Sequence, residues 1–167
     1  MKAIEIAKET DKKFPPMMMH LLGLVRMGYV SSPEKGEYII TEKGKLALGV
    51  PEVNKEKAVV ILAYLPHDKS FSFFVDVDKP LNLHAHSLRD FAINIEKADV
   101  VSIEFHTKRG DFEAWFKGLG DEELAKKVGL LKQKNVAGES LRRQMHEIAW
   151  QRYVALSKLA DQPVYSD

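Results

Sequence analysis

The segment Leu48-Gly49-Val50-Pro51 most restricts how this 167-residue chain can fold, because it ends a helical pattern and divides the chain. A glycine just after an apolar periodic stretch, followed closely by a proline, is typical of a helix end. The segments before and after this division are each short, and chains of such lengths fold as small domains with small cores. We therefore expect two domains, at residues 1–50 and 51–167.

The composition is that of a folded globular protein, and it excludes several classes of function. Hydrophobic residues make up 45% of the chain and charged residues 29%, and 25 Lys and Arg against 24 Asp and Glu give a net charge of +1. This balance argues against non-specific coating of nucleic acid, which requires a large cationic excess. The absence of cysteine excludes disulfides, thiol catalysis and metal centres with cysteine ligands.

The sequence gives no sign of a membrane segment. No apolar run approaches the roughly 20 residues that a helix needs to cross a bilayer. The N-terminal stretch MKAIEIAKETDKK carries charges throughout and is unlike a signal peptide. We therefore expect a cytoplasmic protein with no membrane partner.

Helical and strand patterns alternate in the first domain. Thr41 is a favourable N-cap for the last helix, and Pro33-Glu34-Lys35-Gly36 is a turn signal between two short strands. The expected elements are helices at residues 2–9, 14–27 and 42–48 and strands at residues 29–31 and 37–40.

The second domain is expected to contain more helix than strand. Asn54, Ser87 and Asp121 are favourable N-caps, and aromatic and β-branched residues favour two strands. The expected helices span residues 55–65, 88–96, 111–117, 122–134 and 139–160, and the expected strands span 71–77 and 100–106. Strands are too few for a doubly wound sheet, so the fold class is α+β, with a small α/β second domain ending in a helical hairpin. We expect the long last helix to serve dimerisation, or the domain to sense a ligand.

Several segments of the first domain resemble the winged helix-turn-helix family. The segment IEIAKE at residues 4–9 is similar to the first helix of that motif, and Met17, Leu21 and Leu24 match buried positions of its second helix. The segment YIITEKGK at residues 38–45 resembles the Y-x-L-T-x-K-G-K stretch that follows the wing in bacterial and archaeal regulators. The resemblance covers residues 3–48 and implies an N-terminal winged helix-turn-helix. The helix that usually precedes this motif is missing before Ile4.

This resemblance implies a dimeric transcription regulator that binds double-stranded DNA, with basic side chains on the phosphates. The candidate phosphate contacts are Lys12, Lys13, His20, Arg26, Lys35, Lys43 and Lys45.

One departure from the family favours a different function. Positions that read base edges in such regulators hold Pro15, Pro16, Met18 and Met19 here, and these side chains offer no hydrogen-bond code. A helix that is apolar on all sides is normally buried on all sides. The alternative is therefore a protein–protein interaction module whose winged helix is packed against the second domain or another subunit and does not bind DNA.

Residues 71–128 resemble an uncharacterised, mostly archaeal domain family, a resemblance that implies a fold but no activity. It rests on the segments SIEFH, RGDFEAWF and LGDEELA within residues 102–125. A small ligand-binding or partner-binding cleft is one interpretation of His106, Arg109, Asp111 and Trp115. The other is structural, with Asp111 as a helix cap or a partner of Arg109 and Trp115 as a core anchor.

A metal-dependent enzyme is a third and weaker hypothesis. His84 and His86 point to one side of an extended chain, and His106 is a candidate third ligand. No HExxH, G-x-S-x-G, Walker A or G-x-G-x-x-G pattern occurs. We therefore expect neither catalysis, nor a bound metal, nor a cofactor.

Overall fold

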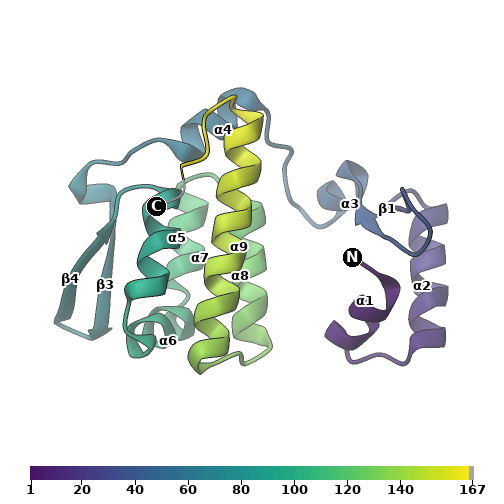
Figure 1. Ribbon diagram of the computed structural model, residues 1–167, viewed down its shortest axis with the longest axis horizontal. Helices are drawn as coiled ribbons and strands as arrows, with labels where there is room; N and C mark the ends of the chain where they lie inside the picture. Colours follow the sequence, from purple (N-terminus) through teal and green to yellow (C-terminus); the bar gives the residue numbers. More distant parts are fainter. Residues whose placement is uncertain (166–167) are drawn as a thin grey trace. The chain divides into compact units, whose positions relative to one another are not determined.

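The computed structural model describes residues 1–165, and internal contacts divide the chain into two units, Met1–Glu52 and Val53–Asp167 (Figure 1). Helices dominate, and each unit contains one small antiparallel two-stranded sheet, so the fold is mixed α and β as the class α+β requires. Among residues 1–165, no helix is both long enough and apolar enough to cross a bilayer.

The first unit consists of three short helices and a two-stranded ribbon. Thr41 caps the third helix, where its side chain accepts a hydrogen bond from the backbone N–H of Gly44. Val30 pairs with Ile40 and Ser31 with Ile39 in the ribbon. The elements are α1 (Ala3–Glu9), α2 (Phe14–Arg26), β1 (Val30–Ser31), β2 (Ile39–Ile40) and α3 (Glu42–Ala47).

Gly44 fixes the position of α3 in this unit. A Cβ at this position would overlap the carbonyl oxygen of Tyr29 and the Cγ1 atom of Ile40. The glycine therefore allows α3 to pack directly against the backbone of Tyr29, just after α2. This close approach explains why a glycine stands between Lys43 and Lys45.

The second unit is a helical layer with a β-hairpin beside it (Figure 1). Asn54, Ser87, Asp99 and Asp121 cap four of its helices through side-chain oxygens. The elements are α4 (Lys55–Leu62), a short 3₁₀ turn (His67–Lys69), β3 (Phe71–Asp76), β4 (Lys79–Ala85), α5 (Leu88–Lys97), α6 (Val100–Arg109), α7 (Asp111–Gly118), α8 (Glu122–Gln133) and α9 (Gly138–Leu159).

The predicted strand at residues 100–106 is wrong, because this segment forms the first two turns of α6. Ser102, Ile103, His106 and Thr107 are buried, a helical period that the β-branched composition obscures. Asp99 begins the helix by accepting a hydrogen bond from the N–H of Val101. The second strand is instead β4, which the sequence analysis missed.

Strand β4 carries weak local signals. It begins Lys79-Pro80, and Asn82 has a left-handed backbone with φ of 50°, both unfavourable in a regular strand. The hairpin is irregular, since the register shifts between the pairs Ser72–His84 and Phe74–Pro80. Pairing with β3, rather than intrinsic propensity, therefore makes this segment a strand.

Aromatic rings form the centre of the second unit's core. Phe73, Phe91, Phe112 and Phe116 are fully buried, and the centroids of their contacting rings lie 4.8 to 6.2 Å apart. Phe91 is edge-to-face with Phe112 and Phe116 and stacked with Phe73. Helix α9 runs along this core and packs against α4, α5, α6 and α8. Leu141, Met145 and Leu156 of its apolar stripe are thus buried inside the unit, while Leu159 is 41% exposed, and a role of this helix in dimerisation stays a prediction.

A buried ion pair joins α9 to the start of α8. The Nε and Nη2 atoms of Arg152 donate to the two carboxylate oxygens of Asp121 at 2.8 and 2.9 Å, and Nη1 donates to Glu123 at 2.9 Å. The Asp121 carboxylate is completely buried and also accepts from the N–H of Leu124. Removing either charge would leave the other buried and unpaired.

We expect Arg152→Met to lower the free energy of unfolding of the second unit by about 3–5 kcal/mol, the cost of breaking a buried pair. Both tryptophans lie in this unit, so urea unfolding followed by tryptophan fluorescence reports on it. Adding Asp121→Asn, which removes the second charge and keeps a capping oxygen, should recover part of the loss. A loss no larger than that of the exposed control Arg143→Met would contradict this role.

Candidate functional site

Five of the predicted phosphate contacts are exposed on the first unit. Lys12 and Lys13 precede α2, His20 lies in its middle, Arg26 in its last turn, and Lys35 in the turn between the two strands. A helix of 13 residues is about 20 Å long. The basic groups are therefore spread along α2 and do not converge on one point.

The two other lysines are engaged within the fold. Lys43 donates from Nζ to the carbonyl of Met27 at 2.7 Å and lies over the ring of Tyr29, 4.9 Å from its centroid. Lys45 pairs with Glu42 at 3.0 Å. Lys43 thus holds α3 against the end of α2, a tertiary contact that the sequence does not reveal.

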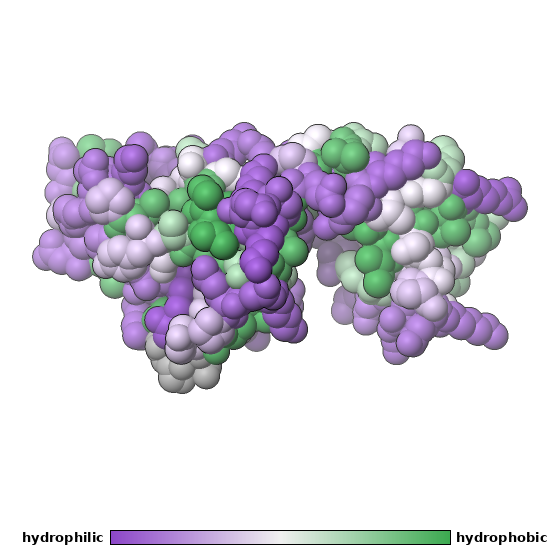
Figure 2. Space-filling model, turned by 90° about the horizontal axis from the view of Figure 1, so that it is seen from above, coloured by the Kyte–Doolittle hydropathy of each residue, from purple (hydrophilic) through white to green (hydrophobic). Residues whose placement is uncertain are grey.

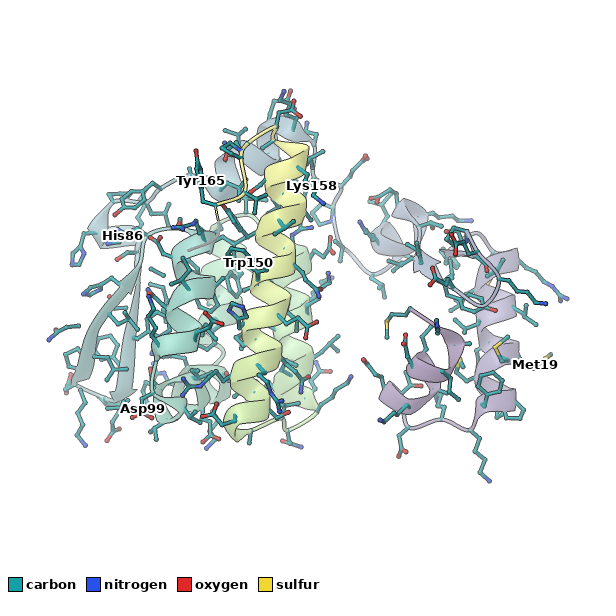
Figure 3. All side chains as sticks on the ribbon, viewed as in Figure 1. Met19, His86, Asp99, Trp150, Lys158 and Tyr165 are labelled. Atoms are coloured by element: carbon teal, nitrogen blue, oxygen red, sulfur yellow. The ribbon has the colours of Figure 1, made fainter. Side chains whose placement is uncertain are left out.

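Helix α2 is buried on one side and exposed on the other. Met17 and Leu21 are buried, whereas Met19 is 71% exposed and Leu22 43% exposed. The side chain of Met19 points away from the body of its unit (Figure 3). The apolar composition of the helix suggested burial on all sides. Within its own unit, however, the helix is buried on one side only.

Besides Met19 and Leu22, the exposed face of α2 carries two prolines, a glycine and two polar side chains. Pro15 and Pro16 begin it, His20 and Arg26 supply its polar groups, and Gly23 lies in its middle. A Cβ at Gly23 would meet no atom within 4 Å. We call the residues Pro15, Pro16, Met19, Leu22 and Gly23 the apolar face of α2.

A second apolar surface lies between α1 and the beginning of α2. A groove of about 660 Å³ is lined there by Ile4, Ala7 and Phe14, with charged side chains around them. Ile4 is 62% exposed and Phe14 44% exposed. Figure 2 likewise shows hydrophobic surface interspersed among the hydrophilic side chains of the protein.

In the second unit, the structure brings His106, Arg109 and Asp111 together. His106 Nδ1 lies 2.8 Å and Arg109 Nε 3.0 Å from the same Asp111 oxygen, Oδ2. The backbone N–H of Phe74 donates to His106 Nε2 at 2.8 Å. Because Nε2 accepts, the neutral ring carries its proton on Nδ1 and donates it to Asp111.

This arrangement holds β3 against α6 and α7. His106 is almost fully buried, with its ring edge-on to Phe71 at 4.8 Å. Burial lowers the pKa of His106 below its usual value and outweighs the opposing effect of Asp111. With both ring nitrogens bonded inside the protein, His106 acts as a support rather than as a proton carrier.

Trp115 does not join this cluster. Its indole N–H donates to the carbonyl of Lys69 at 3.1 Å, and the ring lies against Phe71 and Phe91. Asp111 does not cap α7, because the preceding residue, Gly110, with φ of 81°, takes the N-cap position without a side-chain bond. The pocket beside His106, Arg109 and Asp111 has a volume of about 310 Å³ and is also lined by Asp76 and Phe105.

The predicted histidine triad is not assembled. His84 and His86 lie near His67, with ring centroids 4.7 and 5.8 Å from it, and His106 is committed to Asp111 and β3. Over residues 1–165, no group of three His, Asp or Glu side chains is placed to hold a metal ion. The arrangement therefore gives no support to a metal site formed by His84, His86 and His106.

His67 belongs to a surface cluster that sequence spacing did not indicate. Tyr64 stacks on His86 with centroids 4.9 Å apart and planes 6° from parallel. His86 Nδ1 is 3.0 Å from the carbonyl of Leu65, and His84 Nδ1 is 3.0 Å from Ser72. Pro66 has an extended backbone and comes directly before the 3₁₀ turn His67–Lys69. This proline is a local sequence signal that a turn begins at His67.

Comparison with protein-family models, with curated proteins and with solved structures finds no significant match to this chain.

Acidification should destabilise the second unit through His106. Its pKa in the folded protein lies below the ordinary 6.5, so the unfolded chain takes up the proton at a higher pH than the folded protein does. The stabilising effect is complete above pH 6.5 and is lost as the pH falls from there toward the lowered pKa. We expect His106→Asn to flatten the dependence of unfolding free energy on pH over this interval, measured by urea unfolding.

His20→Asn is the matched control, because His20 is exposed and lies in the other unit. An equal pH dependence in wild type and His106→Asn would contradict this assignment.

Proposed function

We propose that the protein is a transcription-regulator-like protein with an N-terminal winged helix, in which α2 binds a second copy of the chain rather than DNA base edges. The winged-helix assignment is supported by the order α1, turn, α2, β1, β2, α3 and by the YIITEKGK segment at residues 38–45. The observation that carries the binding mode is the exposed apolar face of α2.

The core of the first unit is small, so it offsets little of the free-energy cost of leaving the apolar face of α2 in water. Its buried core cluster consists of Ala3, Ala7, Met17 and Leu21, with the partly buried Ile6, Met18 and Tyr38 packed against it. Domains of this size are marginally stable even with well-filled cores, and this chain has no disulfides to compensate. Covering Met19 and Leu22 would add about 1.5–3 kcal/mol for each fully buried side chain.

A second copy of the chain is the partner that we propose for this face. Gly23, which has no side chain, lies beside Met19 and Leu22 on the same face. Two α2 helices can therefore approach closely at this point, as small residues permit at helix contacts. The groups that base reading requires are missing from most of the face, since Pro15, Pro16 and Met19 offer no hydrogen bonds.

We expect Met19→Glu to shift the protein toward the monomer in sedimentation velocity. Loss of about 1.5 kcal/mol from each of two copies weakens the dimer about a hundredfold. The substitution is tolerated in the fold because the side chain is 71% exposed. Leu46→Glu is the matched control, on α3 of the same unit and 59% exposed. A wild-type protein that is monomeric at all concentrations, or equal effects of the two variants, would contradict the proposal.

DNA binding is the second candidate, and charge favours it. Between Lys12 and Arg26 the sequence contains basic residues and no acidic ones. Together with Lys35, the exposed side chains of Lys12, Lys13 and Arg26 carry the positive charge to neutralise phosphates without reading bases, and His20 can donate a hydrogen bond to one.

Binding of a fluorescent DNA duplex, measured by anisotropy over a series of salt concentrations, separates the two candidates. We expect weak binding without sequence preference, confined to low salt and lost in Lys12→Glu/Lys13→Glu. Lys97→Glu/Lys117→Glu, which changes two exposed lysines of the second unit, serves as the control with a matched change of charge. Tight, sequence-dependent binding at physiological salt that His20→Ala abolishes would overturn the proposed binding mode and establish a DNA-reading helix.

A further inference from the structure

Methionine supplies all of the sulfur in this chain, which has six methionines and no cysteine. Oxidation of an accessible methionine to the sulfoxide turns an apolar side chain into a polar one. Three of the six methionines are consecutive in α2, as Met17, Met18 and Met19. Their burial determines which of them an oxidant in solution can reach.

Helix geometry gives the three methionines of α2 different environments. Successive residues of a helix lie about 100° apart around its axis. Met17 is in the core at 3% exposure, Met18 is partly buried against that core, and Met19 is 71% exposed. The side chain of Met19 points away from the body of its unit (Figure 3). Of these three side chains, Met19 is therefore the one that a water-soluble oxidant meets first.

The other methionines do not combine exposure with a place on the apolar face of α2. Met145 is fully buried in α9 of the second unit. Met1 and Met27 are exposed, but Met1 precedes α1 and Met27 follows α2 as its C-cap. Oxidation of Met1 or Met27 therefore leaves the apolar face as it is, whereas oxidation of Met19 changes the face itself.

A sulfoxide at Met19 is unfavourable wherever protein covers it. A polar group taken out of water costs free energy unless it forms a hydrogen bond. His20 and Arg26, the two donors on the exposed side of α2, would have to lose water themselves to bond it. The remaining residues of the apolar face have no side-chain donor, namely Pro15, Pro16, Leu22 and Gly23. The sulfoxide therefore favours a free copy over one whose α2 is covered.

We propose that Met19 is a modification site, oxidised by hydrogen peroxide or an organic hydroperoxide, and that its sulfoxide releases the contact between two copies. This inference rests on the proposed contact through α2. The sulfur lone pair attacks one peroxide oxygen, and an S–O bond forms as the O–O bond breaks. The departing oxygen takes the proton of the transferred hydroxyl and leaves as water or an alcohol. Sulfur loses two electrons, and the peroxide gains them.

The exposure of Met19 in the free copy links oxidation to association. Peroxide reaches this side chain in the free copy, whereas the proposed contact covers it. Oxidation therefore withdraws free copies from the association equilibrium. Dedicated enzymes reduce methionine sulfoxide again, so the modification is reversible.

Peroxide treatment of the full-length protein tests the site through peptide mass spectrometry and, after removal of the peroxide, sedimentation velocity. We expect Met19 to gain oxygen about tenfold faster than its buried neighbour Met17. Oxidation of Met19 should be slower above the midpoint of self-association than below it. The oxidised protein should associate about a hundredfold more weakly, about tenfold for each of the two copies.

Met19→Leu and Met27→Leu separate the sulfur from the apolar surface. Leucine keeps the size and apolar character of methionine, so Met19→Leu should associate as the wild type does, both before and after peroxide. Met27→Leu is the matched control at an exposed position and should lose association on oxidation as the wild type does. Equal losses in the two variants, or oxidation of Met19 no faster than that of Met17, would overturn the proposal.

The association of the untreated wild type distinguishes failure of the contact from failure of the oxidation. A wild type that is monomeric before treatment contradicts the contact through α2, and with it the release. A wild type that self-associates and continues to do so with Met19 oxidised contradicts the oxidation proposal alone.

Discussion

The exposed apolar face of α2, on a unit with a small core, is the constraint on which the functional proposal depends. The buried core cluster of this unit is Ala3, Ala7, Met17 and Leu21, while Met19 is 71% exposed. Small units without disulfides reach useful stability by burying further surface against a partner. We propose that protein covers this helix, whose exposed face is apolar apart from His20 and Arg26.

The second unit meets the same requirement internally. Its aromatic core is enclosed by α9 and neighbouring helices, and two buried polar contacts determine how these elements meet. Arg152 joins α9 to the cap of α8 through Asp121, and His106 joins β3 to α7 through Asp111. Each contact is satisfied on both sides, and such groups favour one arrangement of the elements over alternatives that would leave a buried polar atom unpaired.

Local sequence signals were sufficient for most elements and insufficient for the sites. Thr41, Asn54, Ser87 and Asp121 cap helices as predicted, because capping depends on neighbours within one turn. The error at α6 arose because β-branched residues imitate a strand, although the burial period is helical. The proximity of His106, Arg109 and Asp111 followed from short spacing, since all three lie at the α6–α7 junction. Contacts between distant segments, such as Lys43 with Met27 or His67 with His84, depend on the tertiary fold and leave no local pattern.

Hydrogen–deuterium exchange of α2 at two protein concentrations, one below and one above the midpoint of self-association, tests the central claim most directly. If a second copy covers the apolar face, the amides of Phe14–Arg26 exchange more slowly at the higher concentration, while those of α9 are unchanged. Exchange in α2 that is independent of concentration, and as slow as in α9 at both, would show that the first unit is stable alone and would contradict the account.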